Sequence, residues 1–131
     1  MELRYAETCA ADLAPKFDLL AEAAVREYPD SDGFFCCDDR LACSLLSALR
    51  RAGKRVPEDV KVVGFNGDFL SQLLSPSLTS VCQNIPQMCQ AAVDCLIRRI
   101  DEETDVEDRI IPVTIARRES TRRLPEDSAG E

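Results

Sequence analysis

Short polar side chains follow two apolar runs of this sequence, at points where strands would end. The pair Asp38-Asp39 follows the run 33–37, and Asn66, in an Asn-Gly-Asp loop, follows the run 60–65. Open α/β sheets bind their ligands at the carboxyl ends of the strands, where such side chains can hydrogen-bond a small molecule. Asn-Gly is also one of the commonest turn dipeptides, so local statistics alone favour a simple turn at Asn66.

The acidic pair permits a second chemistry. Hard cations such as Mg²⁺ prefer several carboxylate oxygens, and phosphoryl transfer needs a cation opposite the phosphate. Asp38 and Asp39 would then belong to a magnesium-dependent phosphoacceptor domain, which needs another aspartate and a lysine at neighbouring strand ends. The chain's lysines, Lys16, Lys54 and Lys61, do not follow an expected strand, which disfavours this alternative. Whatever Asp38 does, Asp39 is the expected N-cap of the next helix.

The composition excludes several other kinds of site. The 131 residues contain no histidine, which rules out Ser-His and Cys-His catalysis and histidine metal ligation within them. The G-x-G-x-x-G and P-loop phosphate-binding motifs are missing. Seven cysteines without a C-x-x-C pair indicate neither a disulfide framework nor a zinc site. A net charge of −8 argues against a nucleic-acid surface. We therefore expect no enzymatic activity, no metal and no cofactor.

The length suits one domain, and 45% hydrophobic residues supply a core. We assign residues 1–121 to that domain and expect the polar tail 122–131 to be disordered. The run 101–108 carries six carboxylates in eight residues and is expected to be a solvated loop. No secretory segment follows Met1 and no run is long enough to span a bilayer, so we expect a cytoplasmic chain with reduced thiols and no membrane contact.

Helical and strand patterns alternate along the chain. Apolar residues at helical spacing predict helices over 17–28, 38–53 and 86–100. Short apolar runs predict strands over 33–37, 60–65, 78–82 and 109–118, the first of them covered on both faces. A short helical turn is expected within 68–75, and Pro112 indicates an edge position or a bulge. This alternation predicts an α/β fold built on a parallel sheet with right-handed crossovers.

Four segments, correctly spaced, carry a family resemblance. They are GFFCCDDRLACSLLSALRRAG at 33–53, KRVPEDVKVVGFNG at 54–67, LSPSLTSVCQ at 74–83 and IARREST at 115–121. Together they resemble the carboxyl-terminal part of the effector-binding domain of lactose-repressor-type (LacI/GalR) bacterial transcription regulators. The resemblance implies a periplasmic-binding-protein-like I fold, in which two three-layer α/β/α subdomains clamp a sugar or nucleoside-like effector. It also implies a homodimer that binds operator DNA through a separate helix-turn-helix headpiece.

The resemblance also assigns candidate ligand contacts. Asp38 stands where the family has an effector-contacting asparagine, and Asn66 stands where it has an aspartate, so acid and amide are exchanged. A carboxylate accepts hydrogen bonds from sugar hydroxyls, whereas an amide both accepts and donates. Gln83, Ile85 and Met88 correspond to positions near the mouth of the pocket.

Important parts of the family's architecture are expected to be missing. The chain would supply most of the second subdomain, an incomplete clamp without the headpiece, as a natural truncation or a cut piece. The helix 86–100 crosses to the first subdomain in the family, so its apolar stripe is expected to be exposed here and to self-associate. The alternative is a solute-binding protein of the same clamp architecture, which the missing signal segment and the motif register disfavour.

Overall fold

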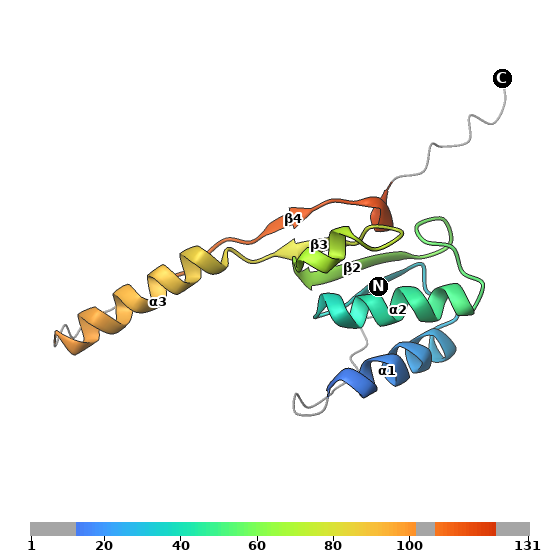
Figure 1. Cartoon of the computed structure of the whole chain (residues 1–131), viewed down its shortest axis with the longest axis horizontal. Helices are drawn as coiled ribbons and strands as arrows, with labels where there is room; N and C mark the ends of the chain where they lie inside the picture. Colours follow the sequence, from blue (N-terminus) through green and yellow to red (C-terminus); the bar gives the residue numbers. More distant parts are fainter. Residues whose placement is uncertain (1–12, 102–106, 123–131) are drawn as a thin grey trace, which may run out of the picture.

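A computed structural model describes residues 13–101 and 107–122 of the chain. Helices and strands alternate in it as the sequence predicts (Figure 1). In chain order the elements are α1 (Leu13–Glu27), β1 (Gly33–Phe35), α2 (Asp39–Arg51), β2 (Lys61–Asn66), the 3₁₀ turn η2 (Phe69–Gln72), β3 (Thr79–Cys82), α3 (Ile85–Ile100), β4 (Thr114–Ala116) and the 3₁₀ turn η3 (Glu119–Thr121). The expected tail beyond Arg122 and the middle of the acidic loop, 102–106, lie outside the described residues.

The strands form one sheet in the order β1-β2-β3-β4. β1 pairs with β2, and β2 with β3, in parallel, so the carboxyl ends of these three strands meet at one edge. β4 pairs with β3 in the antiparallel sense, with Val81 opposite Ile115. The sheet is therefore mixed and mostly parallel, which confirms the predicted α/β class. β4 lies at the edge of the sheet, and it is shorter than predicted because Pro112, which lacks an amide hydrogen, falls just before it.

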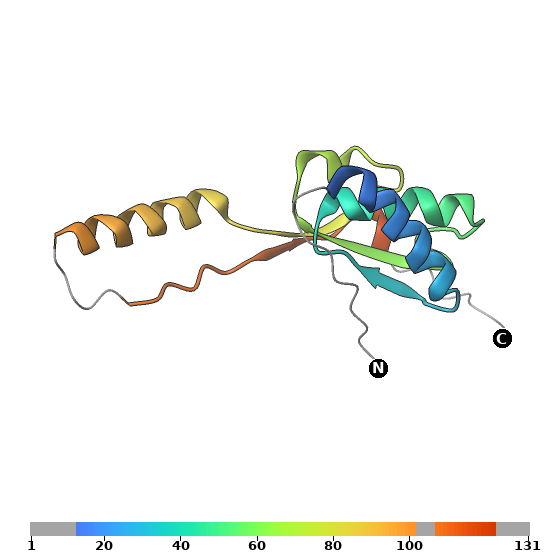
Figure 2. The same ribbon diagram turned by 90° about the horizontal axis from the view of Figure 1, so that it is seen from below.

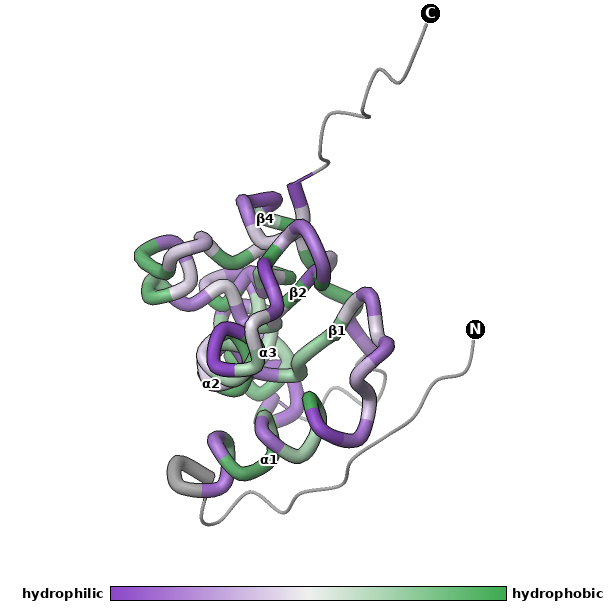
Figure 3. The backbone as a smooth tube through the Cα atoms, turned by 90° about the vertical axis from the view of Figure 1, so that its right-hand side faces the viewer, coloured by the Kyte–Doolittle hydropathy of each residue, from purple (hydrophilic) through white to green (hydrophobic). Residues whose placement is uncertain are grey.

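One face of the sheet carries the hydrophobic core. α2 packs on this face through Leu45 and Leu49, and α1 packs beside α2 through Ala21 (Figure 2). Val62 of β2 and Leu78 before β3 are fully buried beneath them. Hydrophobic residues gather in the strands and the facing helices, and most turns are hydrophilic (Figure 3). The η2 turn is different, because Phe69 and Leu70 are exposed there.

The opposite face of the sheet is apolar but open. Phe35 of β1 is 65% exposed and Ile115 of β4 is 58% exposed. Phe35 meets Phe65 of β2 edge to face, with ring centroids 6.4 Å apart. The prediction that strand 33–37 is covered on both faces is therefore wrong for the part of the chain that the structure describes, because neither α1 nor α2 lies on this side. A helical layer on this face, which a three-layer subdomain requires, is not supplied by the described residues.

α3 projects away from the sheet as an arm, with residues 107–113 running beside it (Figures 1 and 2). Its first turn is capped by Asn84, whose side chain accepts a hydrogen bond from the backbone N–H of Gln87. The apolar stripe predicted for this helix is exposed: Leu96, for example, is 60% exposed. No helix among the described residues is long and apolar enough to cross a membrane.

Candidate ligand-binding site

Three of the predicted ligand contacts meet at the carboxyl ends of β1, β2 and β3. Asn66 is the last residue of β2, Asp38 lies between β1 and α2, and Gln83 follows β3. The Nδ2 of Asn66 donates to Oδ2 of Asp38 at 3.5 Å, and the Nε2 of Gln83 donates to Oδ1 of Asn66 at 3.0 Å. Asp38 lies 28 positions before Asn66 in the sequence, and Gln83 lies 17 positions after it. The fold thus brings the three side chains into one polar row across three strand ends.

Asp38 lies directly before α2 and carries the negative charge of this row. Its carboxylate accepts a hydrogen bond from the backbone N–H of Arg40 at 2.7 Å, which makes Asp38 the N-cap. The prediction that Asp39 is the N-cap is therefore wrong: Asp39 is the first helical residue. The guanidinium of Arg40 also forms an ion pair with Asp38 at 3.0 Å. These side-chain hydrogen bonds from Arg40 hold the pKa of Asp38 below its usual value of 3.8, so the carboxylate is ionised at neutral pH.

Asn66 adopts a backbone conformation that is uncommon for its residue type. Its φ is 106°, and the next residue, Gly67, has φ 72°. Gly67 is required at this point, because a Cβ atom there would lie 2.5 Å from the Sγ of Cys82. A simple Asn-Gly turn and a ligand contact at Asn66 are thus compatible interpretations of this loop. The turn directs the Asn66 side chain into the row with Asp38 and Gln83. Strained non-glycine positions of this kind cluster at functional sites.

The acidic pair is divided between two environments. Asp39 is only 3% exposed, and its carboxylate accepts hydrogen bonds from the hydroxyl of Ser80 and the backbone N–H of Asp68, both at 2.7 Å. Asp38 is engaged by Arg40 instead. Among the described residues, no group of three or more Cys, Asp or Glu side chains is placed to hold a metal ion. The oxygens that a magnesium site would need are thus bound by protein donors.

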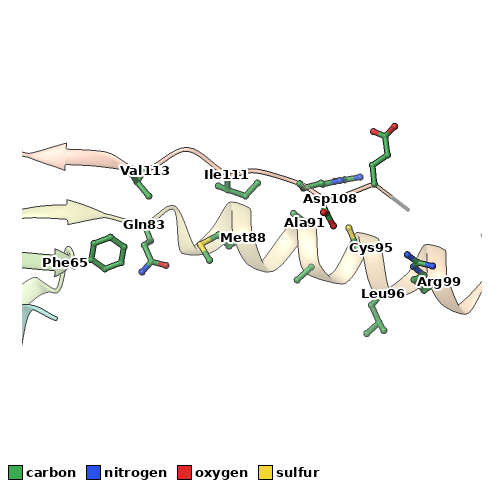
Figure 4. Close-up of a pocket in the computed structure, with 13 residues that line it drawn as sticks. Phe65, Gln83, Met88, Ala91, Cys95, Leu96, Arg99, Asp108, Ile111 and Val113 are labelled. Carbon is green, nitrogen blue, oxygen red and sulfur yellow. The ribbon is translucent and has the colours of Figure 1, made fainter. Parts of the chain in front are cut away.

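A groove of about 630 Å³ extends from this polar row along α3 (Figure 4). Phe65, Gln83 and Met88 line its inner end, and Ile111 and Val113 line the opposite wall. Gln83 therefore joins the polar row to an apolar groove. Asp38 and Asn66 do not line the groove. Ile85, predicted near the pocket mouth, does not line it either and is 51% exposed.

The IARREST segment fastens the end of the domain to the sheet. The Oγ of Ser120 donates to the carbonyl of Val62 at 2.7 Å and accepts from the N–H of Thr79 at 2.8 Å. The guanidinium of Arg118 donates to the carbonyl of Leu78 at 2.6 Å and to Ser71 at 3.1 Å. The sequence identifies this segment only as a family motif, whereas in the structure it holds β2, β3 and η2 together.

The buried thiol of Cys36 lies just before the acidic pair. Desolvation by burial, with electrostatic interactions with Cys37, Asp39 and Asp38 adding to it, raises the pKa of Cys36 to about 12. The thiol is therefore protonated and unreactive at neutral pH. This fits a core role for Cys36, which belongs to the same buried cluster as Val62 and Leu49.

The family model described as periplasmic binding protein-like domain matches residues 2–121. The chain belongs to this family. Its relatives are LacI-family regulators, which confirms the resemblance seen in the motifs. It is 35% identical over 88 residues to the uncharacterized HTH-type transcriptional regulator YvdE of Bacillus subtilis, covering 67% of this chain and 28% of that protein. It is 34% identical over 104 residues to the ribose operon repressor of Halalkalibacterium halodurans, covering 79% of this chain and 31% of the repressor.

Solved structures show the same relationship. A LacI family transcriptional regulator from Arthrobacter sp. FB24, in complex with lactose, has 32% identity and a TM-score of 0.69, over 81% of this chain and 40% of that one. The transcriptional regulator CelR, in complex with cellobiose, has 31% identity and a TM-score of 0.74, over 81% of this chain and 33% of that one. The periplasmic-binding-protein-like chain thus spans between about a quarter and two fifths of the length of these relatives, which are regulators rather than enzymes.

Proposed function

We propose that this chain is the effector-binding part of a LacI-type transcriptional regulator and that the polar row at the strand ends contacts a sugar-like effector. Asp38, Asn66 and Gln83 are the proposed polar contacts, with Met88 and Ile85 at the mouth. The observation that carries the proposal is the hydrogen-bonded row itself, at the strand ends where open α/β sheets bind ligands. Relatives of similar fold were solved with lactose and cellobiose bound.

The row has the chemistry that hydroxyl-rich ligands need. The ionised carboxylate of Asp38 accepts hydrogen bonds, and the amides of Asn66 and Gln83 both donate and accept. Charge-assisted hydrogen bonds are the stronger kind, so Asp38 is the proposed anchor for a ligand hydroxyl, which would replace the long 3.5 Å contact from Asn66. Phe65, at the inner end of the groove beside Gln83, offers an apolar surface for the less polar face of a sugar ring.

The proposed mechanism is a change in clamp closure. The described residues supply one wall of the site, and the first subdomain of such a clamp would supply the other. An effector that binds the closed form better than the open form shifts the population toward closure. In the whole regulator this shift would be coupled to operator DNA through a helix-turn-helix headpiece that these residues do not contain. We propose that the regulator acts in the cytoplasm as a homodimer without enzymatic activity.

The experiment compares the chain alone with a completed clamp. The matched segment of the ribose operon repressor of Halalkalibacterium halodurans would be replaced by residues 17–121, and both proteins titrated calorimetrically with ribose, lactose and cellobiose. We expect the chain alone to bind at best at millimolar Kd, because half of the contacts are missing, and the chimera to bind one sugar at micromolar Kd. Asn66→Ala should abolish that binding, while Gln90→Ala, an amide on the exposed part of α3, should not.

A chimera that folds and binds none of the sugars would contradict a sugar effector. Micromolar binding by the chain alone would contradict the incomplete clamp.

A further inference from the structure

The buried carboxylate of Asp39 is the feature of this site that ligand contact does not explain. Asp39 is 3% exposed, so it cannot reach an effector, and the N-cap of α2 is supplied by Asp38. Yet an almost fully buried carboxylate is rare unless its oxygens are matched by donors. Both donors of Asp39 come from outside its own helix: the backbone N–H of Asp68 and the hydroxyl of Ser80.

These two hydrogen bonds fix the backbone directly after Asn66. Oδ2 of Asp39 holds Asp68, two residues after Asn66, at 2.7 Å. Oδ1 of Asp39 holds the Oγ of Ser80 at 2.7 Å, and that Oγ in turn accepts the backbone N–H of Gly67 at 3.1 Å. Two consecutive backbone amides after Asn66 are therefore fixed by one carboxylate, the first through Ser80 and the second directly.

The neighbouring strand leaves room for this arrangement. Gly64 lies two residues before Asn66 in β2, and a Cβ atom there would collide with Oδ1 of Asp39. Without that carboxylate the amide of Asp68 would lose its acceptor, and Ser80, which accepts from the amide of Gly67, would lose the group that orients its hydroxyl. The turn would then have no internal reason to keep Asn66 at φ 106°. A conformation that is costly for asparagine persists only when the surroundings over-determine it.

We infer that Asp39 is the positioning residue of the site: its buried carboxylate, relayed by Ser80, holds the loop after β2 so that Asn66 faces Asp38. The inference deepens the proposed function, because it assigns to a buried residue the orientation of a proposed ligand contact. It also explains why the two adjacent aspartates differ in role: Asp38 faces the ligand side, and Asp39 faces the protein.

The replacement of Asp39 by asparagine tests this. Asparagine has nearly the same shape but is uncharged and has one acceptor oxygen, so an NH2 group must replace either the oxygen that faces Ser80 or the one that faces Asp68. Amide hydrogen exchange, read residue by residue by NMR on the full chain, would report the loop directly. In D39N we expect protection of the Asp68 and Gly67 amides to fall by roughly tenfold or more, because Asp68 loses a charged acceptor and Ser80, the acceptor of Gly67, loses its own charged partner. Protection of Leu49 in the core, which reports global unfolding, should fall only as far as the free energy of unfolding of D39N falls, and less than protection of the loop amides.

Three companion variants separate positioning from general damage. S80A should reduce protection of Gly67 while leaving Asp68 closer to wild type, since Asp39 still holds it. D30N, in the exposed turn after α1, and S44A, in α2, are the matched controls and should change neither amide. In the wild type and the controls, the Asn66 side-chain amide should show a nuclear Overhauser contact to Gln83, and D39N should lose it.

Different outcomes test the positioning role of Asp39 and the proposed binding of a sugar. A folded D39N with unchanged protection of Gly67 and Asp68 and an intact contact between Asn66 and Gln83 overturns the inference. If D39N does not fold, unchanged Gly67 protection in S80A overturns it. The losses described above support it even if no sugar binds the chimera, a result that would count against the proposed function alone. In a chimera that binds sugar, D39N should raise the Kd by roughly tenfold or more.

Discussion

Adding one methyl group at Gly64 should damage the site from within the sheet. The new Cβ atom would collide with Oδ1 of Asp39 and would lie 2.9 Å from Cδ2 of Leu78, which is fully buried. Overpacking of a core position costs about 1–3 kcal/mol. Displacing Asp39 would also weaken its hydrogen bonds to Ser80 and Asp68, and such a loss costs about 1–3 kcal/mol. We therefore expect Gly64→Ala to lower the free energy of unfolding by about 3 kcal/mol.

Urea denaturation followed by far-ultraviolet circular dichroism measures this change. The control is Gly33→Ala in β1, where the nearest atom to the new Cβ is the carbonyl oxygen of Lys61 at 3.6 Å, an ordinary contact. We expect that variant to stay within about 1 kcal/mol of wild type, since a strand alanine is no worse than glycine. Equal stability of the two variants would show that Asp39 does not fill the space above Gly64 and would refute the packing argument.

Three further predictions follow from the same geometry. Asn66→Gly should raise the free energy of unfolding by about 1 kcal/mol, because glycine adopts a φ of 106° without strain. The same variant should weaken effector binding in the chimera, and a lower stability than wild type would argue against strain at Asn66. Hydrogen bonds from Arg55 lower the pKa of Asp59 from 3.8 to about 2. The melting temperature of wild type should therefore exceed that of Asp59→Asn by its full margin above pH 3.8, and the margin should shrink as the pH falls toward 2. A margin that does not change with pH would contradict this prediction. Sedimentation at high concentration should show self-association through the exposed face of α3, reduced by Ile97→Asp, and a strictly monomeric wild-type profile would refute this.

Periodicity and motif order predicted most of the fold. The core stripe of α2, including Leu45 and Leu49, follows from the apolar spacing within one segment. The parallel pairing of β1 with β2 and of β2 with β3 follows from the alternation of helical and strand segments along the chain. The coverage of β1 could not be predicted in the same way. An apolar run such as 33–37 shows that a strand can be buried on both faces, but not that helices are present to bury it. Phe35 is exposed for that reason.

The sequence predicted which residues meet at the candidate site, but not the separate roles of Asp38 and Asp39. Family register brought Asp38, Asn66 and Gln83 together, and the structure places them in one hydrogen-bonded row. Sequence alone could not say which of two adjacent aspartates caps α2, because both stand at the strand-to-helix junction. That choice depends on Ser80, which is 41 residues away along the chain and donates to Asp39 only once β3 is in place.

The central claim is that the carboxyl ends of β1, β2 and β3 form an effector-contacting surface. The most direct measurement is a titration of the isotope-labelled chain with lactose, cellobiose and ribose, followed by NMR at the backbone and side-chain amides. Even millimolar binding shifts resonances at the contact residues. We predict that the largest changes occur at the side-chain amides of Asn66 and Gln83, saturate with one of the sugars, and vanish in Asn66→Ala. Shifts confined to other parts of the chain, or none with any sugar, would contradict the account.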